Sequence, residues 1–121
     1  MSNKEILQRL AATANAGDVD VAEWYTEDFK LYEPGVPLER VTGHEGARRM
    51  LAHLRTALIP ETRFEILDMV EEDDRVAVRW LFSGKKEGHP VVMPCIAIYR
   101  FVDGRIAEDW GIACYEGHPW P

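Results

Sequence analysis

Cysteine is scarce in this chain, with two residues among 121. Neither stands in a CxxC pair, and no histidine lies at metal-ligand spacing from either of them. The sequence therefore excludes a disulfide framework and a zinc site of the usual Cys/His pattern.

Basic residues are also few: 14 Lys and Arg stand against 21 Asp and Glu, for a net charge of −7. Nucleic acids and anionic membranes require a basic footprint, so neither is an expected partner. No apolar run approaches membrane-spanning length, and the N-terminal MSNKEILQRL has no hydrophobic signal-peptide region. These absences predict a soluble, cytoplasmic, acidic protein.

Apolar residues are plentiful enough for one core. They make up 46% of a length that suits a single domain. Because the sequence contains no repeats, low-complexity segments or linkers, residues 1–121 are expected to form one domain.

The last third of the chain reads as three strands. The runs RVAVRWLFSG, VVMPCIAIYRF and RIAEDWGIACY are rich in β-branched and aromatic residues. Turn residues separate them, Gly84 to Pro90 after the first run and Asp103-Gly104 after the second, the latter a strong hairpin signal. One side of the first run collects Val76, Val78, Trp80 and Phe82.

Helical patterns dominate the first half. Ser2 with Glu5 fits a capping box, and Gly17 is placed to end the helix that follows. Its apolar stripe is Ile6, Leu7, Leu10, Ala11 and Ala14. Asp20 with Glu23 predicts a short helical turn that carries Val21, Trp24 and Tyr25.

A second long helix is expected after a loop with prolines at 34 and 37. Thr42 with Glu45 fits another capping box, and the helix should close before Pro60. Its stripe is Ala47, Met50, Leu51, Leu54 and Leu58. A short extended stretch at 29–33, and a strand at 63–70 followed by an acidic turn at 71–74, complete the pattern.

Helices followed by an antiparallel meander predict an α+β fold. Four long strands with three helical segments on one side would form a strongly bent, mostly antiparallel sheet closed into a cone. Such a cone encloses a pocket between sheet and helices.

Three segments resemble the nuclear-transport-factor-2-like superfamily, with its SnoaL-like branch nearest. They are NAGDVDVAEWYTEDFKLYEPG, DDRVAVRWLFSG and CIAIYRFVDGRIAEDW, and the resemblance covers nearly the whole chain. It implies a cone-shaped barrel, a deep apolar pocket, no metal or organic cofactor, and usually a homodimer. Many chemistries and some non-enzymes share this fold, so the resemblance is weak evidence for any one reaction.

Glu33, in LYEPG, stands where ketosteroid isomerases of this superfamily carry their proton-shuttling carboxylate. A strand-end acid beside a proline-fixed turn is held rigidly, and burial would raise its pKa. The alternative interpretation is that Glu33 is a solvated residue of the turn, without a catalytic role. Other parts of that site are missing: Leu10 replaces the oxyanion tyrosine and Ala97 the protonated aspartate, which argues against ketosteroid isomerisation.

Asp109 is the second candidate acid. SnoaL-like cyclases carry an aspartate just after the tryptophan of a GRIxxHWD pattern, whereas this chain reads GRIAEDWG and places Gly111 there. Asp109 lies two residues earlier, which is one full pleat, so it projects from the same face. It is the candidate for a relocated acid.

The face that Asp109 occupies depends on the last hairpin. A three-residue loop with Gly104 in a G1 bulge pairs Ala97 with Asp109 and places Asp109 in the pocket. A two-residue type I′ turn would place Glu108 and Trp110 there instead. We prefer the first register, which leaves Trp110 and Ile112 outside, on a surface for a two-fold dimer.

The remaining candidates are weaker. Trp80 and Tyr99, with Phe82, Ala97 and Gly111, are expected to bind substrate in the pocket, or simply to fill the core. Trp24 and Tyr25 read as core residues. His44 and His53 could be additional acid/base groups or solvated helix residues. Arg79 is expected at the surface, and Cys95 and Cys114 on opposite faces, without a disulfide.

These residues favour an enzyme that works by general acid/base chemistry, without a cofactor, on a small, largely apolar carbonyl compound. Isomerisation, aldol-type cyclisation and dehydration all fit two carboxylates in one pocket. Glu33 would be the base and Asp109 the acid or its orienting partner. A non-catalytic carrier and a dimerisation module are the alternatives. An open cavity holding both carboxylates would favour the enzyme.

Overall fold

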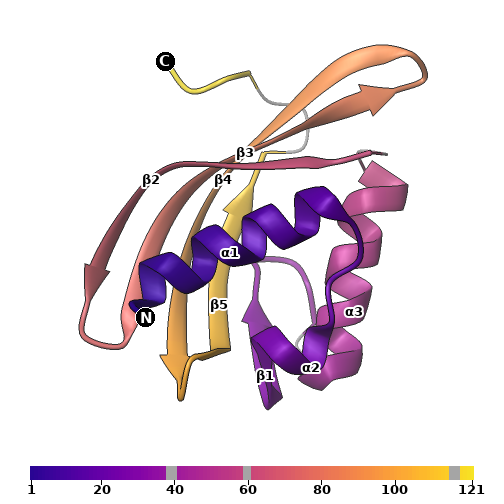
Figure 1. Ribbon diagram of the computed structural model, residues 1–121. Helices are drawn as coiled ribbons and strands as arrows, with labels where there is room; N and C mark the ends of the chain where they lie inside the picture. Colours follow the sequence, from indigo (N-terminus) through magenta and orange to yellow (C-terminus); the bar gives the residue numbers. More distant parts are fainter. Residues whose placement is uncertain (38–40, 59–60, 115–117) are drawn as a thin grey trace.

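The computed structural model describes residues 1–37, 41–58, 61–114 and 118–121, without the side chains of 56–58. Three helices, α1 (Asn3–Ala16), α2 (Val21–Trp24) and α3 (Gly43–Ala52), lie on one side of a curved sheet (Figure 1). A π-helical turn, η2 (His53–Leu58), continues α3. No helix in the described part of the chain is long and apolar enough to cross a membrane.

The sheet has five strands: β1 (Tyr25–Tyr32), β2 (Arg63–Glu72), β3 (Arg75–Lys86), β4 (His89–Val102) and β5 (Arg105–Ala113). Their order is β1-β5-β4-β3-β2, with β1 parallel to β5 and all other neighbours antiparallel. The predicted α+β class with a bent, mostly antiparallel sheet is confirmed. The sheet remains open, because β1 and β2 are its edges, and the helices cover the inner face.

Helix α1 forms as its sequence predicts. The Ser2 hydroxyl accepts a hydrogen bond from the Glu5 amide at 3.1 Å, which satisfies one of the free N–H groups of the first turn. All five residues of the predicted stripe are buried. Asn15 then pairs with the Phe64 backbone, donating to its carbonyl at 2.8 Å and accepting from its amide at 2.7 Å. This contact ties the end of α1 to β2.

Thr42 is the N-cap of helix α3, as predicted, but the predicted capping box is wrong, because the Thr42 side chain makes no capping hydrogen bond. Instead the helix start packs tightly on the preceding loop. A Cβ at Gly46 would stand 2.5 Å from the Val41 carbonyl carbon, so only glycine fits there. Leu58 of the predicted stripe lies outside the described side chains.

The turn between β3 and β4 is shorter than predicted. Both strands continue through the Gly84–Pro90 segment and pair up to Lys86 and His89. Only Glu87 and Gly88 form the turn, each with φ in the left-handed region that type I′ turns require.

The β4–β5 hairpin corrects the preferred register in detail. Asp103 (φ 49°) and Gly104 (φ 80°) form a two-residue turn, so the predicted G1 bulge is absent. The bulge lies instead at Ala107, between the pairs Phe101–Ile106 and Arg100–Glu108. The predicted pairing of Ala97 with Asp109 is therefore wrong, since Asp109 pairs with Tyr99. The extra residue of the bulge restores the alternation that a two-residue turn alone would have reversed. Asp109 therefore faces inward, as preferred.

Candidate active site

A cavity of about 460 Å³ lies between the sheet and the helices, within the usual size range of small-molecule sites. Its lining is mostly apolar. All seven predicted site residues are in its wall, namely Glu33, Trp80, Phe82, Ala97, Tyr99, Asp109 and Gly111.

Asp109 is the most perturbed carboxyl group of the cavity. It is 6% exposed, and its Oδ1 atom has no hydrogen-bond partner among the described residues. Burial, with the negative charge of Glu33 as a second cause, raises its pKa from 3.8 to about 8. At neutral pH Asp109 is therefore mainly a neutral acid that can donate a proton.

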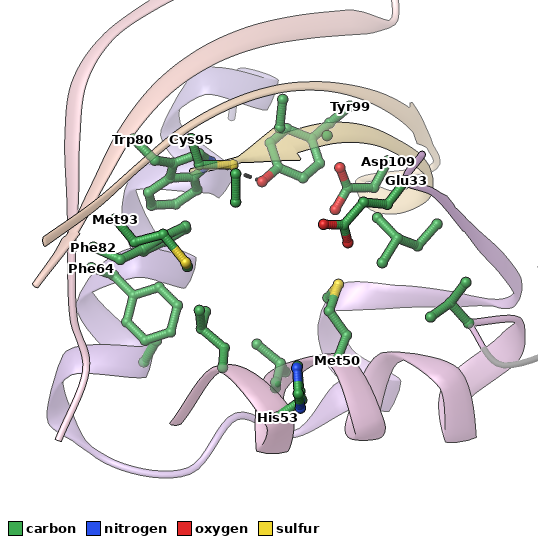
Figure 2. A pocket seen from close by; sticks show the side chains of 18 of the residues that line it. Glu33, Met50, His53, Phe64, Trp80, Phe82, Met93, Cys95, Tyr99 and Asp109 are labelled. Carbon is green, nitrogen blue, oxygen red and sulfur yellow. Dashed lines mark hydrogen bonds between the residues drawn. The ribbon is translucent and has the colours of Figure 1, made fainter. Parts of the chain in front are cut away.

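Glu33 directly follows β1, where the chain turns. The Val36 amide donates to the Glu33 carbonyl at 3.0 Å, and Gly35 has a φ of 86°, so Pro34-Gly35 occupies the centre of a type II turn. This turn holds the half-buried Glu33 at the cavity wall. Figure 2 shows its carboxyl group beside that of Asp109, both directed into the cavity.

The other end of the cavity is aromatic. Trp80 and Phe82 stack with ring centroids 5.3 Å apart, and Phe64 meets Phe82 edge-on at 5.3 Å. Met93 completes this wall, which faces the two carboxyl groups across the cavity (Figure 2). The cavity thus has one acidic end and one flat apolar end.

Tyr99 lies between these two ends. On β4 it is directly opposite Asp109 on β5. Its hydroxyl oxygen accepts a hydrogen bond of 2.8 Å from the indole Nε1 of Trp80 (Figure 2). Burial, followed by the charge of Asp109, raises the pKa of Tyr99 well above 10, so the phenol stays neutral.

Gly111 lies beside the Asp109 carboxyl group, where a larger side chain would begin in van der Waals contact with it. A Cβ at position 111 would stand 3.4 Å from Asp109 Oδ1 and 3.7 Å from the Ala97 Cβ. The small residues Ala97 and Gly111 thus border the Asp109 carboxyl group in the cavity wall.

The two candidate histidines, His44 and His53, lie outside the acidic end of the cavity. His44 is 2.9 Å from the Tyr25 carbonyl oxygen, to which its Nε2 donates, since a carbonyl can only accept. His53 is exposed and contributes to the cavity wall from the side of α3 (Figure 2). Arg79 is at the surface as predicted, paired with Asp68 at 2.6 Å.

Both cysteines are free, as expected. Cys95 lines the cavity, and burial raises the pKa of its thiol to about 12, which leaves it a poor nucleophile. Cys114 is exposed. Within the described ranges, no group of three or more His, Cys, Asp or Glu residues could hold a metal ion.

Sequence reasoning missed several wall residues. Tyr25 is buried in the core as predicted, but it also lines the cavity, and burial raises its pKa well above the usual value, so the phenol stays neutral. Met93 follows the same two-residue period as Cys95 and Ala97, so strand alternation alone could have identified it. Phe64 is directly opposite Phe82 across β2 and β3, a pairing that only the register reveals.

Comparison with known families gives one match: the model of the SnoaL-like domain covers residues 7–109. No curated protein sequence matches the chain significantly.

Solved structures of the same fold are similar over most of the chain. IdmH, a proposed polyketide cyclase from Streptomyces antibioticus, is 25% identical with a TM-score of 0.75, and the match covers 93% of this chain and 92% of IdmH. A loop-truncated IdmH variant is 27% identical, with a TM-score of 0.78, and the match again covers 93% of this chain and 92% of the other. A proposed SnoaL-like polyketide cyclase from Jannaschia sp. CCS1 is 22% identical, with a TM-score of 0.76, over 92% of this chain and 84% of the other.

Proposed function

The chain belongs to the SnoaL-like domain family, and we propose that it is a general acid/base enzyme that moves protons next to a carbonyl group. The fold and its polyketide cyclase neighbours support a cyclase or isomerase type of function in general terms. The observation that carries the specific proposal is the pairing of Glu33 with a buried Asp109 in one apolar cavity. An apolar carrier would need neither acid.

Each carboxyl group has a different role in this proposal. The Glu33 carboxylate removes a proton from the carbon next to the carbonyl, and the electron pair moves toward the carbonyl oxygen. The neutral Asp109 carboxyl donates its proton to an oxygen of the same substrate, leaving a carboxylate. Since one acid gains the proton that the other loses, their combined charge is unchanged, and no cofactor is required.

The substrate class follows from the two ends of the cavity. The aromatic wall of Phe64, Trp80 and Phe82 suits a flat apolar body, and the acidic end suits a polar group with exchangeable protons. A small, largely apolar compound with a carbonyl group satisfies both. Ring closure of such a compound by an aldol-type step is the reaction we favour, in keeping with the proposed activity of IdmH.

Hydrogen–deuterium exchange tests the proton-transfer step without knowledge of the substrate. The probe is 2-acetylnaphthalene in D₂O, and loss of its methyl signal is followed by ¹H NMR. We expect the protein to accelerate exchange and Glu33→Gln to lower the rate by about 100-fold or more. Glu27→Gln, an exposed glutamate of β1, is the matched control and should retain the rate.

The acid role predicts the pH profile of this exchange. Because Asp109 must be protonated, the rate should fall as pH rises through about 8, the pKa of Asp109. The Asp109→Asn variant should catalyse exchange of the probe more slowly, and its rate should no longer decrease as pH rises through about 8. Equal exchange by wild type and Glu33→Gln would refute the proposal, and binding of the probe without exchange would favour a carrier.

We also propose that the protein assembles as a two-fold dimer through the outer face of the sheet. Ile96, Ile98 and Ile112 are 50%, 41% and 65% exposed there. Ile96 pairs with Ile112 and Ile98 with Trp110, so the four residues form one contiguous patch on β4 and β5. The ion pair Arg100–Glu108 on the same two strands supplies both signs of charge nearby. A contiguous exposed apolar patch commonly marks a partner surface, and a two-fold dimer would pair the same patch of both subunits.

A further inference from the structure

The hydrogen bond between Trp80 and Tyr99 has a defined direction. An indole N–H can only donate, so the Tyr99 oxygen is the acceptor of the 2.8 Å contact. The proton of the Tyr99 hydroxyl must then point away from Trp80. Both side chains are buried, at 3% and 7% exposure, so bulk water is a poor partner for that proton.

Among the described residues, the Tyr99 hydroxyl is hydrogen-bonded to the Trp80 indole, and this bond leaves the hydroxyl proton available to donate elsewhere. Tyr99 lines the cavity, and Figure 2 shows its hydroxyl oxygen directed into the cavity, between the aromatic wall and the two carboxyl groups. A buried donor without an acceptor is unfavourable, because the group has lost its hydrogen bond to water. An oxygen of a bound molecule would satisfy it.

The indole that directs this proton is held from several sides. Its ring stacks on Phe82 with an interplanar angle of 24° and meets the edge of Phe64. The Trp80 carbonyl accepts a hydrogen bond of 3.0 Å from the indole of Trp120, in the C-terminal segment. Trp80 is thus fixed in both its backbone and its side chain, and the orientation of the Tyr99 hydroxyl is fixed with it.

We infer that the Tyr99 hydroxyl donates a hydrogen bond to the carbonyl oxygen of the substrate, and that Trp80 is the positioning residue that directs it. The inference takes its substrate class from the proposed function and adds the orientation of the substrate in the cavity. The carbonyl oxygen meets Tyr99, the adjacent carbon faces Glu33, and the apolar body lies against Phe64 and Phe82. As the proton leaves carbon, the charge that develops on oxygen meets a preoriented donor.

The electrostatics of Tyr99 agree with this arrangement. Burial dominates and keeps the phenol protonated, so it is available as a donor. The Trp80 hydrogen bond acts in the opposite direction and lowers the pKa. It withdraws electron density from the Tyr99 oxygen and makes its remaining proton a stronger donor.

Two probes of the same shape test the carbonyl contact. 2-Acetylnaphthalene carries a carbonyl group and 2-ethylnaphthalene does not. We expect wild type to bind the ketone about tenfold more tightly, as measured by calorimetry, because only the ketone satisfies the Tyr99 proton. Tyr99→Phe should abolish the preference, and Trp80→Phe should reduce it about threefold while retaining an aromatic ring. Phe64→Leu is the matched control, and it should weaken the binding of both probes equally.

The infrared carbonyl band of bound 2-acetylnaphthalene supplies a readout that a purely structural role of Trp80 would not move. The band should shift to lower frequency in wild type, return to its unbound position in Tyr99→Phe, and lie between these positions in Trp80→Phe. An unshifted band in wild type, or equal binding of both probes, would overturn the inference even if Glu33→Gln abolishes exchange. The protein could instead prefer the ketone in a way that depends on Tyr99 and yet catalyse no hydrogen–deuterium exchange. That result would support the inference and refute the proposed acid/base function.

Discussion

At the scale of single residues, Asp109 couples the site to stability. In the folded chain its pKa is about 8, whereas the ordinary value of an aspartic acid is 3.8. Between these values the folded protein binds a proton that the unfolded chain has released. Rising pH therefore favours unfolding in this window, by up to about 1.4 kcal/mol per pH unit from this group alone.

Asp109→Asn should remove this dependence. The amide has nearly the same shape and no charge to desolvate, so the variant should be more stable than wild type at pH 8. The difference in unfolding free energy should grow from about pH 4 to about pH 8 and stay constant above it. Urea denaturation at several pH values measures it. A constant difference across this range would show that Asp109 does not titrate in the folded state as stated.

Glu33 acts on the same titration. Its negative charge is the second cause of the raised pKa of Asp109, after burial. Glu33→Gln should therefore lower the pKa of Asp109 while leaving the melting temperature unchanged or raised. Carboxyl ¹³C NMR of the Asp109 side chain measures the pKa directly. The exposed control Glu27→Gln should leave it unchanged.

At the scale of elements, the β4–β5 hairpin determines whether Asp109 or its neighbour Glu108 faces the cavity. Its turn needs left-handed backbone at Gly104, where a Cβ would meet only the Ile6 Cδ1 atom at 3.8 Å. Gly104→Ala therefore creates no clash and tests the backbone conformation alone. We expect a loss of about 1–2 kcal/mol in the free energy of unfolding, measured in urea.

Gly17→Ala is the matched control for this prediction. Gly17 also has open space around its Cβ position, but its φ of 161° is extended backbone, which other residues adopt. It should change stability by much less than Gly104→Ala. Equal losses at the two positions would mean that the left-handed turn is not what constrains position 104.

At the scale of the whole molecule, the outer isoleucines predict the assembly. Ile112→Lys places a charge at the centre of the proposed interface and should convert the dimer to a monomer at micromolar concentration, as measured by light scattering. Val70→Lys is a matched control, because Val70 is 71% exposed on the edge strand β2, outside the patch. It should leave the dimer intact. A wild-type monomer would contradict the proposed dimer.

Local sequence determined most of the elements. Capping at Ser2, the apolar stripe of α1 and the alternation of β3 depend on neighbours a few residues apart, so pattern alone predicted them. The same alternation indicated that Trp80 and Phe82 share one face of β3. The family resemblance indicated Glu33 and Asp109, since neither position has a distinctive local pattern.

Tertiary structure alone decided how these residues meet. The bulge at Ala107 has no signature in RIAEDWG, because it reflects a competition between turn geometry and burial of the whole strand. Nor does sequence reveal that Asn15 pairs with the Phe64 backbone, a contact between residues 49 positions apart. The raised pKa of Asp109 likewise follows from burial and from Glu33, a residue distant in sequence, because desolvation and charge act through space.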